Sequence, residues 1–170
     1  MLPNKLVDLG EKPMCAAAER RTVDPENVDP FNLERFVQAQ APVFQRVLGE
    51  LRAGTKMSHW MWFIFPQIKG LGRSPTAIEY AISGVDEARA YLWHPVLGSR
   101  LKECTRLVLQ VQNRSAAEIF GSPDDMKFRS CMTLFAQISP DDASSGSDIF
   151  AQALQKYFDG VPDQLTLDRL

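Results

Sequence analysis

A chain of 170 residues is long enough for one domain with a single hydrophobic core. Apolar residues make up 45% of it and charged residues 24%, which is typical of a globular protein and argues against a disordered chain. Its 19 basic and 21 acidic residues give a net charge of −2, which excludes nucleic-acid binding by bulk electrostatic attraction.

The first 29 residues show no regular hydrophobic period. They mix proline, alanine and charged side chains, so we expect a flexible leader with a short helix around residues 16–20. The globular domain is predicted to span residues 30–170.

Apolar side chains then recur at helical spacing from Leu33 to Leu51. Asp29-Pro30 is a suitable start for this helix, and Gly54 can adopt the left-handed conformation that ends one. Pro42 lies inside the pattern, which predicts a kink or two abutting helices because proline cannot donate a backbone hydrogen bond.

Six more helices are predicted along the rest of the chain. Most of them carry a recognisable start or stop, such as the capping box that Ser115 forms with Glu118. We expect these helices from Ser74-Pro75 to Gly84, from Asp86 to Trp93, over 96–112, over 115–120, over 128–138, and from Ser147 to Gly160, with a further short one from Asp163.

The segments between these helices complete the expected fold. His94 precedes Pro95 in "WHPVLG" and is expected to orient a turn, while residues 140–147 ("PDDASSGS") are expected to form an exposed loop. Only residues 60–65 are ambiguous between strand and helix, because they form a short apolar run. The prediction is an all-α, single-domain fold of about six to eight helices.

Three cysteines, Cys15, Cys104 and Cys131, form no CxxC motif, and the chain has two histidines. A zinc cluster and a disulfide framework are therefore not expected, and we predict no metal and no cofactor. The apolar runs are far shorter than the roughly 18 residues of a membrane-spanning helix, and the N-terminus lacks the apolar core of a signal peptide. We expect a soluble, cytoplasmic protein.

Several blocks of the sequence resemble one bacterial family, catalogued as domain of unknown function 1810. The blocks include "HWMWFIFPQ", "GLGRS", "HPVLGSRL" and "IFGSPDDMKFRSCMTLF", and the resemblance covers residues 29–170. It implies a compact all-α fold, and it brings neither an established activity nor catalytic residues. Some members carry the label "calpastatin", a disordered protease inhibitor, which the periodic apolar pattern of this chain contradicts. Cys131 stands where the family commonly has a serine, which argues against an obligatory hydroxyl there.

The clearest candidate for a site is the window between Glu50 and Glu79, which contains no acidic residue. Basic side chains flank a run of aromatic ones there, and two glycines precede a predicted helix start at Ser74. Glycines let backbone N–H groups approach a ligand closely, and lysine and arginine would bind its charge. The alternative is an ordinary inter-helix turn with solvated bases.

Each polar candidate has a structural alternative as well. The tryptophans could stack on a flat ligand or belong to the core, and His59 could act as a general base or as a structural hydrogen-bonding group. Gln40 interrupts an apolar stripe and must bond either another helix or a ligand. The candidate ligand-binding residues are Lys56, His59, Trp60, Trp62, Gln67, Lys69, Gly70, Gly72, Arg73, Ser74 and Gln40.

The leading hypothesis is a protein that binds, and could turn over, a small anionic, nucleotide-like ligand around residues 52–75. The sequence identifies no catalytic residue, so enzymatic activity stays open. The alternative is a non-enzymatic interaction module that uses the aromatic segment or a helical groove, with no identifiable protein partner. Single-stranded nucleic-acid binding through the tryptophans is disfavoured by the neutral charge of the domain. No membrane contact is expected.

Overall fold

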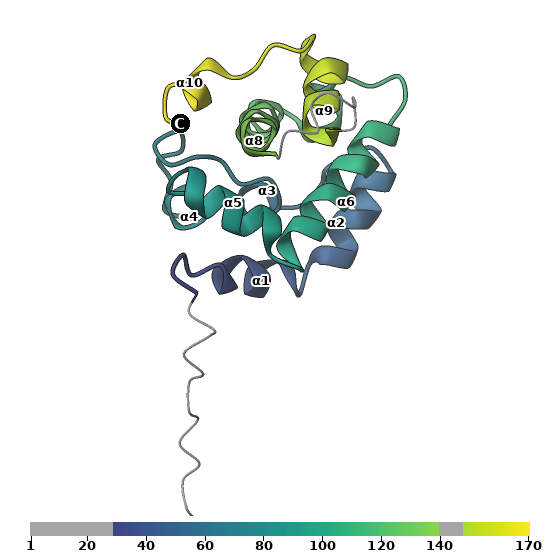
Figure 1. Cartoon of the computed structure of the whole chain (residues 1–170). Coiled ribbons are helices and arrows are strands. Elements are labelled where there is room, and N and C mark those ends of the chain that lie inside the picture. Colours follow the sequence, from purple (N-terminus) through teal and green to yellow (C-terminus); the bar gives the residue numbers. More distant parts are fainter. Residues whose placement is uncertain (1–28, 140–147) are drawn as a thin grey trace, which may run out of the picture.

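The computed structural model describes residues 29–139 and 148–170 of the chain, and these residues form ten α-helices (Figure 1). The predicted all-α fold is confirmed. The helix number exceeds the prediction because four helices have only four or five residues. The helices are α1 (Glu34–Gln40), α2 (Phe44–Arg52), α3 (Met61–Ile64), α4 (Pro75–Glu79), α5 (Val85–Trp93), α6 (Leu97–Gln110), α7 (Ala116–Phe120), α8 (Asp124–Ile138), α9 (Ile149–Phe158) and α10 (Gln164–Leu167).

The long helical pattern at the start of the domain is divided into two helices at Pro42. Helix α1 ends at Gln40 and α2 begins at Phe44, so proline separates two abutting helices, one of the two outcomes predicted. Gly54 has φ +67° and its N–H donates to the Leu51 carbonyl, which ends α2 as expected.

Several helix boundaries follow from local capping chemistry. Ser115 and Glu118 form the predicted capping box at the start of α7. The predicted starts of α5 and α9 were wrong, by two residues and by one residue. Helix α5 begins at Val85 rather than after Asp86, and the cap of α9 is Asp148, whose carboxylate accepts the Phe150 N–H at 2.9 Å. The predicted leader up to residue 28 and the loop 140–147 lie outside the described residues.

His94 orients the junction of α5 and α6, as predicted. Its Nδ1 accepts the backbone N–H groups of Val96 and Leu97 at 3.2 and 3.3 Å, so the imidazole occupies the position of a helix cap. The junction also brings Gly98, in the first turn of α6, against the backbone of Leu92 in the last turn of α5.

Helix α8 lies at the centre of the molecule, where α5, α7, α9 and α10 pack around it (Figure 1). Its Phe128 makes edge-on ring contact with Phe65 and stacks on Phe120, with centroids 5.0 and 4.7 Å apart. The segment 60–65, ambiguous in the sequence, is helical at α3 and contributes Phe65 to this core. The only β pairing in the described residues is one parallel bridge between Ile68 and Ile82.

Candidate functional site

The aromatic part of the predicted window is largely core. Trp60, Ile64 and Phe65 are buried, and the Trp60 indole Nε1 donates to the Glu50 carboxylate at 2.8 Å. Trp62 is half-buried, and the Lys127 ammonium lies 4.8 Å from its ring centroid. The structure therefore places one tryptophan in the interior and the other beneath a lysine of α8.

Glu50 organises the loop that leads into α3. Its carboxylate accepts hydrogen bonds from the N–H groups of Met57 and Ser58, from the Ser58 hydroxyl and from Trp60. Partial burial alone would raise the pKa of Glu50, but these hydrogen bonds outweigh it and hold that pKa below its ordinary value of 4.5. The carboxylate is therefore a structural anchor for the segment that carries Lys56 and His59.

Replacing this anchor should destabilise the fold in a pH-dependent way. Because the pKa of Glu50 is lowered on folding, its contribution is fully present above about pH 4.5 and is lost as the pH falls through the folded-state pKa. Glu50→Gln should lower the free energy of unfolding by about 1–3 kcal/mol at neutral pH. It should also flatten the acid dependence of urea denaturation midpoints below pH 4.5. An unchanged acid slope in the variant would contradict this role.

Lys56 is engaged by the protein itself. Its ammonium lies 2.7 Å from one oxygen of Asp124, and the Lys127 ammonium lies 2.7 Å from the other. The Lys56 ammonium also lies 5.3 Å from the centroid of the Trp60 ring, and the Lys56 side chain is largely buried. The two lysines and the carboxylate thus link the segment before α3 to the start of α8. His59, in contrast, is exposed.

Gln40 forms hydrogen bonds to other helices, which is one of the two alternatives predicted for it. It is 1% exposed, and its Nε2 donates to the Phe63 carbonyl at 2.7 Å and to the Tyr91 hydroxyl at 3.1 Å. Arg100 donates to its Oε1 at 3.2 Å. The amide therefore joins α1 to α3, α5 and α6, and these bonds offset the cost of burying it.

The basic side chains of the turn before α4 are exposed. Lys69 and Arg73 both lie at the surface, and the Ser74 hydroxyl caps α4 by accepting the Ala77 N–H at 3.2 Å. Gln67, half-buried, uses its backbone carbonyl to accept the Ile82 N–H. Lys69 donates its own N–H to the Ile82 carbonyl, so the start of the turn is tied to the segment after α4.

The two glycines of this turn make room for other parts of the protein. A methyl group at Gly72 would overlap the side chain of Ala77. Gly70 has φ +95°, and a Cβ there would lie 3.1 Å from the Arg169 guanidinium Nε. The structure therefore accounts for both glycines by packing and backbone conformation.

Arg169 is the residue that the sequence analysis missed. The end of the chain lies beside the loop that precedes α4 (Figure 1), and this brings Arg169 next to Gly70. We define Lys69, Arg73 and Arg169 as the basic turn. Within residues 29–139 and 148–170, no carboxylate lies within ion-pairing distance of any of the three. No local sequence signal joins Arg169 to the turn, because the contact is made only on folding.

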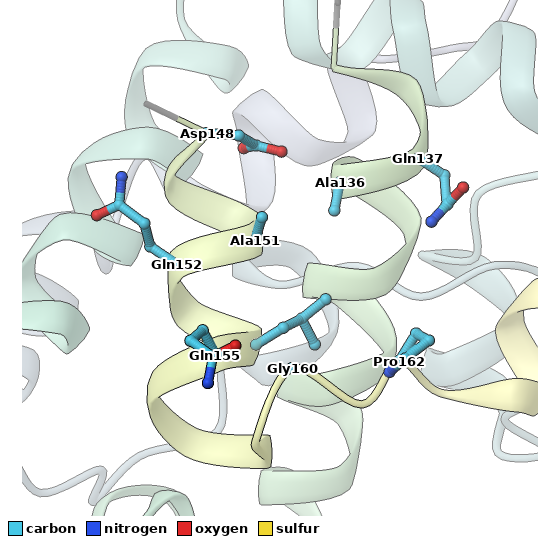
Figure 2. Close-up of a pocket in the computed structure, with 9 residues that line it drawn as sticks. Ala136, Gln137, Asp148, Ala151, Gln152, Gln155, Gly160 and Pro162 are labelled. Carbon is cyan, nitrogen blue, oxygen red and sulfur yellow. The ribbon is translucent and has the colours of Figure 1, made fainter. Parts of the chain in front are cut away.

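A separate cavity of about 460 Å³ lies between α8 and α9 (Figure 2). It contains none of the predicted site residues. Another, of about 530 Å³, lies between the start of the domain and α5, and it is lined in part by Asp29, Glu34 and His94. In the described part of the chain, no three His, Cys, Asp or Glu side chains are placed to hold a metal ion, and no helix is long and apolar enough to cross a membrane.

Comparison with known proteins gives a family and a fold, without an activity. The sequence matches the family described as "Protein of unknown function (DUF1810)" over residues 30–170. The crystal structure of the conserved hypothetical protein Rv1873 from Mycobacterium tuberculosis is similar, with 55% sequence identity and a TM-score of 0.79. The similarity covers 84% of this chain and 98% of that one. A comparison with curated proteins found no match.

Proposed function

The chain belongs to the DUF1810 family of proteins of unknown function, and we propose that it binds a small anionic ligand at the basic turn. The observation that carries this proposal is the approach of Arg169 to Gly70, which adds a third base to Lys69 and Arg73. The turn carries two exposed cations and has a third, from a segment distant in sequence, beside Gly70; none of the three has an ion-pair partner in the described residues.

The arrangement favours recognition of charge over recognition of an aromatic ring. Lys56 is neutralised by Asp124, and the Trp60 N–H is already bonded to Glu50. The anionic group of the ligand therefore supplies the contacts, since arginine can bind phosphate or carboxylate oxygens in a bidentate manner. A nucleotide-like ligand fits this proposal through its phosphates. A cytoplasmic location is part of it, in keeping with the free, buried thiols of Cys104 and Cys131.

Calorimetric titration with pyrophosphate and with ATP at low ionic strength tests the proposal. Arg73→Ala and Arg169→Ala should each weaken binding roughly tenfold, the loss expected from one charge-assisted contact of about 1.4 kcal/mol. Arg106→Ala is the matched control, because Arg106 is exposed on α6 and its loss changes the net charge equally. An equal effect in all three variants, or no binding by the native chain, would overturn the proposal.

The second candidate is an interaction module, favoured by Trp93. Its side chain is 69% exposed at the end of α5, although tryptophan side chains are usually largely buried in a folded domain. Under this alternative a protein partner covers Trp93. Trp93→Ala would then remove partner binding and leave anion affinity unchanged, whereas the basic-turn variants would do the reverse.

A further inference from the structure

The cavity between α8 and α9 exists because small side chains face each other across the two helices. Ala136 of α8 and Ala151 of α9 line it, where larger residues would close the space. Leu154 and Pro162 add apolar surface, and Pro162 lies at the end of the cavity away from Asp148 (Figure 2). The two helices remain packed against each other beside the cavity, and Phe135 and Phe150 hold them together with ring centroids 5.7 Å apart. The cavity is thus built on rigid elements.

One carboxyl group gives the cavity its electrostatic character. Asp148 caps α9, is half-buried, lines the cavity, and its carboxyl group points toward α8 (Figure 2). One of its oxygens caps α9 through the Phe150 N–H. Burial raises the pKa of Asp148, more than the capping bonds and the nearby Lys102 lower it. Within residues 29–139 and 148–170, no basic side chain forms an ion pair with Asp148.

The remaining polar groups are neutral amides. Gln137 and Gln155 line the cavity, and the Gln155 amide oxygen lies over the backbone of Gly160. None of the described residues that line the cavity is basic. An anion would meet the Asp148 carboxylate and no basic side chain among the described lining residues, so the lining selects against the ligand class proposed for the basic turn.

We propose that the cavity between α8 and α9 binds a small primary amine with an apolar body. The ammonium group would pair with the Asp148 carboxylate, at the end of the cavity where α9 begins. The apolar body would lie on Ala151, Leu154 and Pro162. A volume of about 460 Å³ lies within the usual range of small-ligand cavities. This site is independent of the basic turn, because it differs in place and in the charge it selects.

Benzylamine and benzyl alcohol make a matched pair of probes, since they share the ring and differ in charge at neutral pH. Binding to the full chain can be followed by NMR chemical-shift titration of α8 and α9. Benzylamine should bind at least tenfold more tightly than benzyl alcohol. Asp148→Asn should remove that preference while α9 stays capped, because asparagine caps a helix about as well as aspartate.

A second variant separates the cavity from nonspecific attraction. Ala151→Leu should fill the space and abolish shifts from both probes, and the exposed position of Ala151 lets the fold tolerate the change. Absence of saturable benzylamine binding to the native chain would overturn the proposal, as would an unchanged preference in Asp148→Asn. Failure here would leave the pyrophosphate result at the basic turn unaffected.

Discussion

Gly98→Ala should destabilise the protein by about 3 kcal/mol or more, because the added methyl group would overlap backbone atoms. A Cβ at Gly98 would overlap the carbonyl oxygen of Leu92 and lie 2.8 Å from its carbonyl carbon. A flexible side chain could move away from such a contact, but the last turn of α5 is held by its own hydrogen bonds. The methyl group would therefore separate α5 from α6.

The matched control is Gly49→Ala, which makes the same chemical change at an open position. Gly49 lies inside α2, is exposed, and has no heavy atom within 4 Å of the position of a Cβ. Because alanine has the higher helix propensity, this variant should be more stable than the native chain by roughly 0.5–1 kcal/mol. Urea denaturation of both variants measures the difference. A loss below about 1 kcal/mol for Gly98→Ala would contradict the tight junction.

Much of the fold is predictable from sequence because local chemistry sets where several of its helices begin and end. Proline at 42, the capping box at Ser115 and the turn at His94 act through neighbours within four residues. Local chemistry of that kind can be recognised without knowing the tertiary structure. The boundary errors amount to two residues at α5, which follows Gly84 rather than Asp86, and to one residue at α9, where the cap is Asp148 rather than the adjacent Ser147.

The candidate site depended on information that local pattern does not contain. The window from 52 to 75 is free of acids in sequence, yet Asp124 lies against Lys56 in the fold. Arg169 reaches Gly70 from the other end of the chain. Composition of a segment can identify which charges it carries, but the partners of those charges are set by tertiary packing. The window thus divided into a neutralised core part and a basic turn.

Two carboxylates, one partly and one fully buried, are a second feature that the sequence did not reveal. Glu50 gathers the loop before α3, and Glu87, in α5, accepts the Ser83 N–H at 2.8 Å. Each lies in a segment whose pattern predicts only a solvated acid on a helix. Their burial is explained by the donors around them, because a buried carboxylate is stable only when its oxygens are paired. Glu87 is paired further, with an arginine from the start of the domain.

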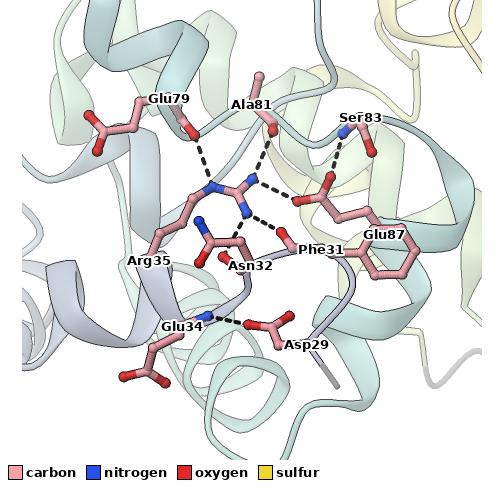
Figure 3. Close-up of polar contacts among 9 residues, drawn as sticks. All are labelled: Asp29, Phe31, Asn32, Glu34, Arg35, Glu79, Ala81, Ser83 and Glu87. Carbon is pink, nitrogen blue, oxygen red and sulfur yellow. Dashed lines mark hydrogen bonds and ion pairs between the residues drawn. The ribbon is translucent and has the colours of Figure 1, made fainter. Parts of the chain in front are cut away.

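Arg35→Ala should therefore destabilise the protein by about 3–5 kcal/mol, because it leaves the buried charge of Glu87 without its partner. The two side chains are 16% and 4% exposed, and they are 2.7 Å apart. The other guanidinium N–H groups donate to backbone carbonyls, at Phe31 and Asn32 on one side and at Glu79 and Ala81 on the other (Figure 3). The arginine thus ties the start of the domain to the segment between α4 and α5.

A double-mutant cycle distinguishes the ion pair from the carbonyl contacts. Glu87→Gln removes the buried charge and keeps an oxygen that can accept the Ser83 N–H. If the unpaired carboxylate causes most of the loss, Arg35→Ala should cost less in the Glu87→Gln background, by roughly 1–3 kcal/mol. Arg35→Lys should fall between the native chain and Arg35→Ala, because lysine keeps the charge but cannot reach carbonyls on both sides at once. Strict additivity in urea denaturation would show instead that the carbonyl contacts carry the stability, and that Glu87 tolerates burial through Ser83 alone.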